Sequence, residues 1–247
     1  SFASYHHKTI GGYHAAKLQR AQDIIDRHLV NGNQKVLDML NTKYIIFGQP
    51  GQEQVQVNPN ANGNAWLVNE FQLVESANAE INALADFQPD STAIVHEEFR
   101  EYIAGFNPTC QGEIQLTSYA PNKLTYQADV DGEQFAVFSE IWYGPEKGWQ
   151  AYIDGEPVDH IRVNYLLRGM RIPSGQHTIT FEFAPASFER GVWVSRIFSS
   201  IILLGLIGYV GYNGYQYAQN PPAEPEPKPK SSKRTAPKVR PKRKKKS

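Results

Sequence analysis

Residues 112–143 read GEIQLTSYAPNKLTYQADVDGEQFAVFSEIWY, and this stretch decides the fold class. Apolar and polar residues alternate along it, and turn signals interrupt it at Pro121–Asn122 and Asp131–Gly132. The same alternation continues through residues 148–183. Short alternating strands separated by such turns are typical of antiparallel sheets packed face to face. We therefore predict an antiparallel β-sandwich over residues 109–190.

Four large aromatic residues fall inside the predicted sandwich: Trp142, Trp149, Tyr152 and Tyr165. Exposed aromatic rings can stack on sugar rings, but buried ones fill the cores of sandwiches. We expect these four residues to fill the core.

The first 108 residues mix helical and strand patterns. Leu18, Ala21, Ile25 and Leu29 recur at steps of three and four, which predicts an amphipathic helix within residues 13–29. We further predict helices at 34–40 and 76–87, a buried strand at 43–47, a loop at 50–64, and strands at 65–74 and 92–99. This region therefore reads as a mixed α/β subdomain over residues 1–108, and the chain as class α+β.

Residues 192–212, VWVSRIFSSIILLGLIGYVGY, form a long apolar stretch. A helix of this length spans roughly 31 Å, enough to cross the core of a bilayer. Aromatic residues flank it, as expected at membrane interfaces, and Arg196 is close enough to one end to reach the headgroups. A buried core helix would need a compact domain on both sides, whereas a Pro-rich tail follows at once. We predict a transmembrane helix over residues 191–218.

The charges of the chain are segregated. Residues 1–219 carry 14 basic and 23 acidic residues, whereas residues 220–247 carry 11 basic and two acidic residues. The positive-inside rule then places the C-terminus in the cytoplasm and residues 1–190 outside it. The tail has few apolar residues and no interleaved aromatic residue, so we predict a disordered basic segment over 219–247 that contacts membrane lipids and no nucleic acid.

Cys110 is the only cysteine, so no disulfide within the chain supports the outward part. No signal peptide is recognisable, and the chain starts at Ser1. An outward domain needs a route across the membrane, so we expect further sequence before Ser1 in the intact protein.

Residues 4–20, SYHHKTIGGYHAAKLQR, collect three histidines, two lysines and two adjacent glycines. Glycines before a helix that begins near Tyr13 would expose backbone N–H groups, where the helix dipole favours a phosphate. We therefore predict an anion- or substrate-binding site formed by Lys8, Gly11, Gly12, Tyr13, His14 and Lys17.

Three alternatives stay open for this segment. The first is a zinc site from His6, His7 and His14, although the spacing matches no common motif and we predict no metal. The second is a general base among these histidines. The third is a glycine turn that only positions a packed helix.

Ordered blocks of the sequence support a resemblance to a known family. They are SYHHKTIGGYHAAKLQRAQDII, VLDMLNTKYII, GNAWLV, YAPNKLTYQADV, AVFSEIWY, GWQAYIDG and RVNYLLRGMRIPSGQHTITFEFAP, between residues 4 and 190. They resemble the C-terminal end of the YfhO family, large bacterial membrane proteins with many spans. The resemblance implies a glycosyltransferase-like parent that uses lipid-linked sugars to decorate cell-envelope polymers. In that class the catalytic acidic residues belong to an early outward loop, so we expect this fragment to lack them.

Two functions follow. The chain is either the C-terminal extracytoplasmic region and last span of such a protein, or a single-span anchored module that binds carbohydrate or protein without catalysis. Glycines at every third position of the span offer a surface for other transmembrane helices, which favours the first: Gly205, Gly208, Gly211 and Gly214. The resemblance implies the bacterial cytoplasmic membrane, with a polyprenyl-phosphate sugar and an envelope polymer as partners. We predict no cofactor.

Overall fold

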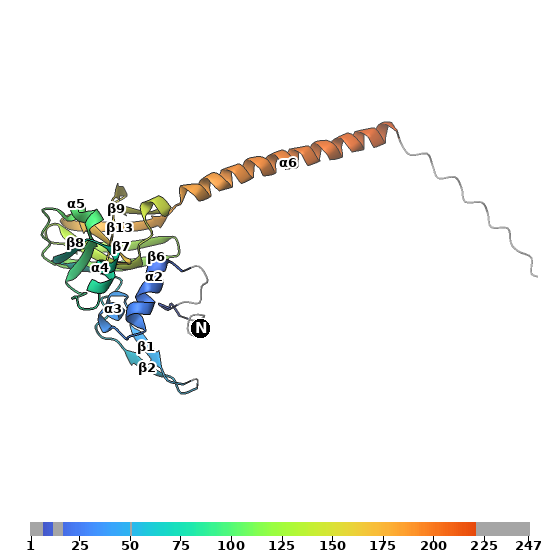
Figure 1. The fold of residues 1–247 in the computed structure, drawn as a ribbon. Coiled ribbons are helices and arrows are strands. Elements are labelled where there is room, and N and C mark those ends of the chain that lie inside the picture. Colours follow the sequence, from blue (N-terminus) through green and yellow to red (C-terminus); the bar gives the residue numbers. More distant parts are fainter. Residues whose placement is uncertain (1–6, 12–16, 50, 221–247) are drawn as a thin grey trace, which may run out of the picture. The chain divides into compact units, whose positions relative to one another are not determined.

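The structure, a computed structural model, describes residues 7–11, 17–49 and 51–220. The chain divides into two compact units between Gly191 and Val192. The first unit combines helices with antiparallel and mixed sheets, and the second consists of the larger part of one apolar helix (Figure 1). The predicted α+β class with one C-terminal apolar helix is confirmed. The predicted disordered tail lies almost entirely outside the described residues.

The first unit is built mainly of strands, which pair into three sheets. The strands are β1 (Tyr44–Phe47), β2 (Gln54–Val57), β3 (Ala65–Val68), β4 (Glu70–Val74), β5 (Thr92–His96), β6 (Gly112–Ala120), β7 (Lys123–Val130), β8 (Gln134–Ile141), β9 (Trp149–Ile153), β10 (Glu156–Val158), β11 (Ile161–Val163), β12 (Leu167–Ile172) and β13 (Gly175–Phe183). The helices are α2 (Gln19–Ile24), the π-helical turn η1 (Ile25–Leu29), α3 (Gln34–Met39), α4 (Ala77–Ala83), the 3-10 turns η2 (Glu97–Phe99) and η3 (Pro145–Lys147), α5 (Arg100–Ile103) and α6 (Ala186–Gln219).

Two sheets pack face to face as the predicted sandwich. One has the strand order β10-β9-β13-β7-β6 and is antiparallel throughout. The other has the order β3-β8-β12-β11-β5-β4. Alternate residues of both sheets point into a shared core, among them Tyr126, Phe138, Met170 and Phe181.

The six-stranded sheet takes strands from both sides of residue 108. β3, β4 and β5 come from the segment predicted as a separate subdomain, and β8, β11 and β12 come from the segment predicted as the sandwich. The predicted strand over residues 65–74 is two strands, because Asn69 interrupts it. β3 and β4 lie at opposite ends of the strand order with only Asn69 between them, so the sheet curls until its edges approach each other.

Short helices cover the outer face of the six-stranded sheet and enclose a second core with it. Two of them begin where the sequence predicted. Asn33 accepts a hydrogen bond from the Val36 N–H at the start of α3, and Ser76 Oγ accepts one from the Ala79 N–H at the start of α4. Such side-chain caps satisfy the first free N–H groups of a helix.

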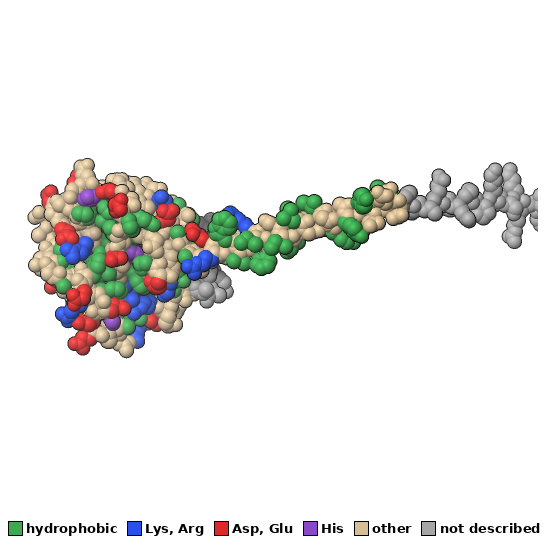
Figure 2. Space-filling model, turned by 90° about the horizontal axis from the view of Figure 1, so that it is seen from above, with side chains coloured by type: hydrophobic (Ala, Val, Ile, Leu, Met, Phe, Trp, Pro, Cys, Tyr) green, Lys and Arg blue, Asp and Glu red, His purple; other side chains and the backbone are tan. Residues whose placement is uncertain are grey.

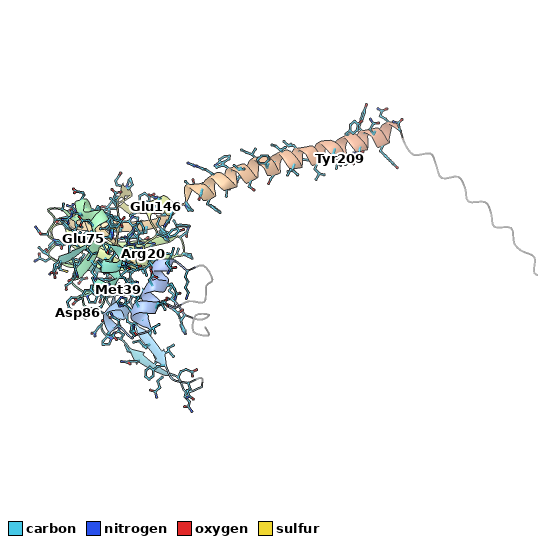
Figure 3. The ribbon with its side chains drawn as sticks, in the orientation of Figure 1. Arg20, Met39, Glu75, Asp86, Glu146 and Tyr209 are labelled. Atoms are coloured by element: carbon cyan, nitrogen blue, oxygen red, sulfur yellow. The ribbon has the colours of Figure 1, made fainter. Side chains whose placement is uncertain are left out.

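A buried carboxylate fastens α2 to the sheet. Glu80 is fully buried and accepts hydrogen bonds from Arg20 Nη1 at 3.1 Å and from the Tyr165 N–H at 3.0 Å. Tyr165 also donates its hydroxyl to Asp23 at 2.7 Å, and Arg20 lies over its ring. Figure 3 shows Arg20 on α2, beside the sheets. Tyr165 is buried, as the sequence predicted, but it belongs to this second core and not to the core of the sandwich.

The strand predicted at residues 43–47 is present as β1, but the prediction that it is buried was wrong. β1 pairs only with β2, and the two form a largely exposed hairpin that projects from the larger sheets (Figure 1). β2 also lies within the predicted loop over residues 50–64. An isolated two-stranded sheet has no second layer to bury either face, so its apolar side chains stay exposed.

α6 is long and apolar, and none of its residues is buried within the structure. It is the one helix among the described residues that is long and apolar enough to cross a membrane. Figure 2 shows hydrophobic side chains along its length. The predicted span, residues 191–218, lies inside it.

Candidate functional site

The structure describes only part of the site predicted near the N-terminus. Lys8, Gly11 and Lys17 are described and exposed, whereas Gly12, Tyr13 and His14 lie outside the described residues, as does His6. Lys17 and Leu18 are not helical, and α2 begins at Gln19. The predicted helix start near Tyr13 lies outside the described residues. Leu18 supplies the first helix acceptor through its carbonyl oxygen. The predicted site as a whole therefore stays a prediction.

Gly11 is not required for conformational reasons in the described backbone. Its φ lies outside the left-handed region, and a Cβ placed on it would meet no atom within 4 Å. Lys8, by contrast, has a defined neighbour. Its Nζ lies 3.0 Å from the centroid of the Tyr119 ring, at the end of β6. Lys8 therefore places a cation at one end of the sandwich.

The same end of the sandwich contains a polar group that the sequence did not reveal. Along β12, Met170 and Ile172 point into the sandwich core, and the period of two places Arg168 in line with them. Along β8, Glu140 is in line with Phe138 in the same way. At this end of the core, two charged side chains therefore replace the expected apolar ones.

Arg168 is buried, and among the described residues no carboxylate is close enough to form an ion pair with it, although Glu140 acts on its pKa. Arg168 is 2% exposed, and its Nε donates to the Ile141 carbonyl oxygen at 3.1 Å. Its Nη1 is buried and has no hydrogen-bond partner among residues 7–11, 17–49 and 51–220. The guanidinium instead lies 4.2 Å from the centroid of the Trp149 ring and 5.0 Å from that of Phe181. A buried N–H without an acceptor is costly, so it points to a water or a ligand at this position.

Two neighbouring groups are also buried without partners. Within the part of the chain that the structure describes, neither the Tyr126 hydroxyl nor either ring nitrogen of His160 has a hydrogen-bond partner. His160 packs edge-on against Phe181, and the Tyr126 ring packs against the same phenylalanine. We call Arg168, Glu140, Tyr126 and His160 the Arg168 cluster.

Burial governs the electrostatics of the Arg168 cluster. Burial lowers the pKa of Arg168 to about 10, although Glu140 opposes this change. Burial also raises the pKa of Glu140, while Arg168 and Lys8 act to lower it. Burial and the nearby Arg168 charge lower the pKa of His160 to about 4, so His160 is neutral at pH 7.

This arrangement suits an anionic, partly apolar ligand. Arg168 offers a free N–H, Tyr126 offers a hydroxyl, and the half-buried Glu140 offers a carboxyl group whose pKa is raised. Trp149 is half-buried, and the Arg168 guanidinium lies over its ring. A phosphate or carboxylate oxygen would accept from Arg168, and sugar hydroxyls would bond with Tyr126 and Glu140. Among the described residues, no group of His, Cys, Asp and Glu side chains could hold a metal ion.

The sequence carried one signal for this site. In LRGMRI, residues 167–172, a strand with Met170 and Ile172 facing a core must also turn Arg168 toward it. The alternation of residues along this strand is visible in the sequence and is enough to predict that Arg168 points inward. The contact of Arg168 with Tyr126 and His160 depends on how distant strands pair, and the sequence does not show this pairing.

Comparison with protein-family models matches residues 38–195 to the family described as "Bacterial membrane protein YfhO". The chain belongs to the YfhO family. The resemblance found in the sequence is thereby confirmed, over both sheets of the sandwich and the first part of α6. Comparisons with the curated proteins and with the solved structures find no match. As a YfhO family chain with one candidate span, the protein is a bacterial membrane protein that associates with lipid.

Proposed function

We propose that this chain is the extracytoplasmic C-terminal region and last span of a YfhO family protein that takes part in lipid-linked sugar transfer to cell-envelope polymers. In this proposal the sandwich binds the phosphate-bearing sugar carrier or the polymer at the outer surface of the cytoplasmic membrane. The observation that carries it is the buried Arg168, whose Nη1 has no hydrogen-bond partner among the described residues. We assign no catalytic residue to this chain.

The proposed orientation is supported by charge. The segment after α6 carries 11 basic residues, which favours the cytoplasmic side, whereas residues 1–219 have an excess of acidic residues. The sandwich would then face the compartment in which envelope polymers are modified.

Lys8 would supply the second cation of the site. It is exposed, lies over Tyr119, and acts on the pKa of Glu140, so its charge reaches the Arg168 cluster. A phosphate held between a buried guanidinium and an exposed ammonium would make charge-assisted hydrogen bonds to both. Gly11, Gly12, Tyr13, His14 and Lys17 stay predicted members of the site, and Gly12, Tyr13 and His14 lie outside the described residues.

A single-span binding module is the competing function. The glycines of α6 help to choose between the two functions. A Cβ placed on Gly205, Gly208, Gly211 or Gly214 would meet no atom within 4 Å. No described residue packs against these glycines, so they leave room for close packing against other transmembrane helices. A lone anchor has no need of such a surface, which favours a last span within a larger bundle.

The test uses cells that depend on the intact protein, with the sugar content of the envelope polymer as the readout. Lys8→Ala should lower the sugar content about tenfold, because one charge-assisted contact is lost. Lys8→Arg should retain it, and so should Tyr119→Leu, which removes the ring but keeps the charge. Lys123→Ala, an exposed lysine on the same unit, is the matched control.

Protein abundance and thermal stability are measured in parallel. Full sugar content in Lys8→Ala at normal abundance would remove Lys8 from the site. Loss of activity in His6→Gln or His7→Gln, at normal stability, would instead favour a histidine acting as a general base.

A further inference from the structure

A pocket lies where η3 meets residues 184–190, and none of its lining residues belongs to the Arg168 cluster. Its volume is about 630 Å³, and all of its lining residues belong to the first unit. η3 and the chain around it form one wall, and residues 184–187 and Arg190 form the other. Figure 3 shows Glu146, one of the lining residues, beside the first turn of α6.

The backbone fixes the two walls to each other. The Ala184 N–H donates to the Gly148 carbonyl oxygen at 2.8 Å. Gly148 has φ +118°, and a Cβ on it would lie 2.7 Å from Pro185 Cβ, so only glycine allows this close approach. The pocket is therefore part of the folded unit.

The pocket has a net positive charge. Lys147 and Arg190 contribute two cations, and Glu146 contributes one carboxylate. Lys147 Nζ is 3.9 Å from Glu146 Oε1 and 5.2 Å from the centroid of the Tyr143 ring, so neither contact occupies it fully. Ser187 adds a hydroxyl group. The charged side chains sum to +1, which complements the single negative charge of a phosphodiester.

The position of the pocket identifies the source of that phosphodiester. Arg190 precedes the apolar stretch by two residues, so the pocket lies at the level of the lipid headgroups when α6 crosses the membrane. We infer that this pocket binds the phosphodiester headgroup of an anionic phospholipid through Lys147 and Arg190. The inference rests on α6 crossing the membrane, as proposed, and is independent of the Arg168 cluster.

The test measures lipid retention by the intact chain in nanodiscs of phosphatidylcholine with and without phosphatidylglycerol. We expect the wild-type chain to retain phosphatidylglycerol in native mass spectrometry. Lys147→Gln and Arg190→Gln should each weaken retention about fivefold, as expected for one basic residue at a membrane surface. Lys123→Gln is the matched control, because Lys123 lies at the same 3.9 Å from Glu182 as Lys147 does from Glu146.

The possible outcomes distinguish a failure of the headgroup site from a failure of the proposed membrane span. If the chain enters nanodiscs but Lys147→Gln and Arg190→Gln retain phosphatidylglycerol like the wild type, the headgroup site is wrong and the membrane span stands. If the chain does not enter nanodiscs, the span itself is wrong. If soluble glycerol phosphate competes fully with the lipid, the pocket binds free phosphate esters, and the assignment to a membrane lipid is overturned.

Discussion

Replacement of Arg168 by methionine should remove the proposed ligand contact at almost no cost in stability. Burial lowers the pKa of Arg168 to about 10, which corresponds to about 3 kcal/mol of free energy spent on keeping the charge in the folded state. Methionine avoids this cost and preserves the apolar stem. It loses the charge-assisted hydrogen bond to Ile141, worth about 2 kcal/mol, and the contacts with the Trp149 and Phe181 rings, worth about 2 kcal/mol. The net change should lie within about 1 kcal/mol.

The assay combines stability and binding on the intact chain. Thermal unfolding should give a midpoint for Arg168→Met within about 4 °C of the wild type. Binding of a short-chain polyprenyl phosphate should weaken at least tenfold, because a charged hydrogen-bond donor is lost. Arg171→Met is the control, because Arg171 lies on the same strand and pairs with Glu133 outside the cluster. It should leave binding unchanged.

A purely structural role for Arg168 predicts a different result. Removal of one partner from a buried charged network usually costs about 3 to 5 kcal/mol, which would lower the unfolding midpoint by about 6 to 20 °C. A large loss of stability together with unchanged binding of the polyprenyl phosphate would refute the proposed site.

Two further predictions concern named positions in the first unit. The pKa of His160 is lowered to about 4, so the unfolded chain binds a proton that the folded chain does not bind as the pH falls through about 6.5. The free energy of unfolding should therefore drop by about 3 kcal/mol between about pH 7 and pH 4. Unfolding measured at both pH values should show that His160→Leu lacks this part of the drop. Gly148→Ala should lower the free energy of unfolding by about 1 to 3 kcal/mol in chemical unfolding, since the φ of Gly148 is +118° and Pro185 leaves no room for a Cβ. Gly11→Ala is the control and should be neutral. Equal stability of the two variants would contradict the packing at η3.

The local elements could largely be predicted, because their signals are local. The alternation and turns of residues 112–183 gave the strands of the sandwich, and Asn33 and Ser76 marked the starts of two helices. The partners of the strands could not be predicted. β3 pairs with β8, and β5 pairs with β11, across long separations in sequence. No sequence feature of one strand identifies its partner. The boundary placed at residue 108 therefore divided strands that share a sheet.

The candidate site shows the same limit. The N-terminal segment attracted attention because its histidines, lysines and glycines lie close in sequence. The Arg168 cluster draws its members from β7, β8, β12 and the residue before β11, so no single stretch displays it. Arg168 alone was detectable, since it is a charge in phase with Met170 and Ile172. That its Nη1 has no hydrogen-bond partner among the described residues became visible only in the folded chain.

The orientation of the sandwich across the membrane tests the central claim most directly. A reporter enzyme that is active only outside the cytoplasm is fused to the intact protein, either before Phe188 or after Lys230. The account predicts activity for the first fusion and none for the second, because the basic segment should remain in the cytoplasm. The reverse pattern would place the Arg168 cluster and the pocket at η3 in the cytoplasm, and would contradict a role in sugar transfer at the outer surface.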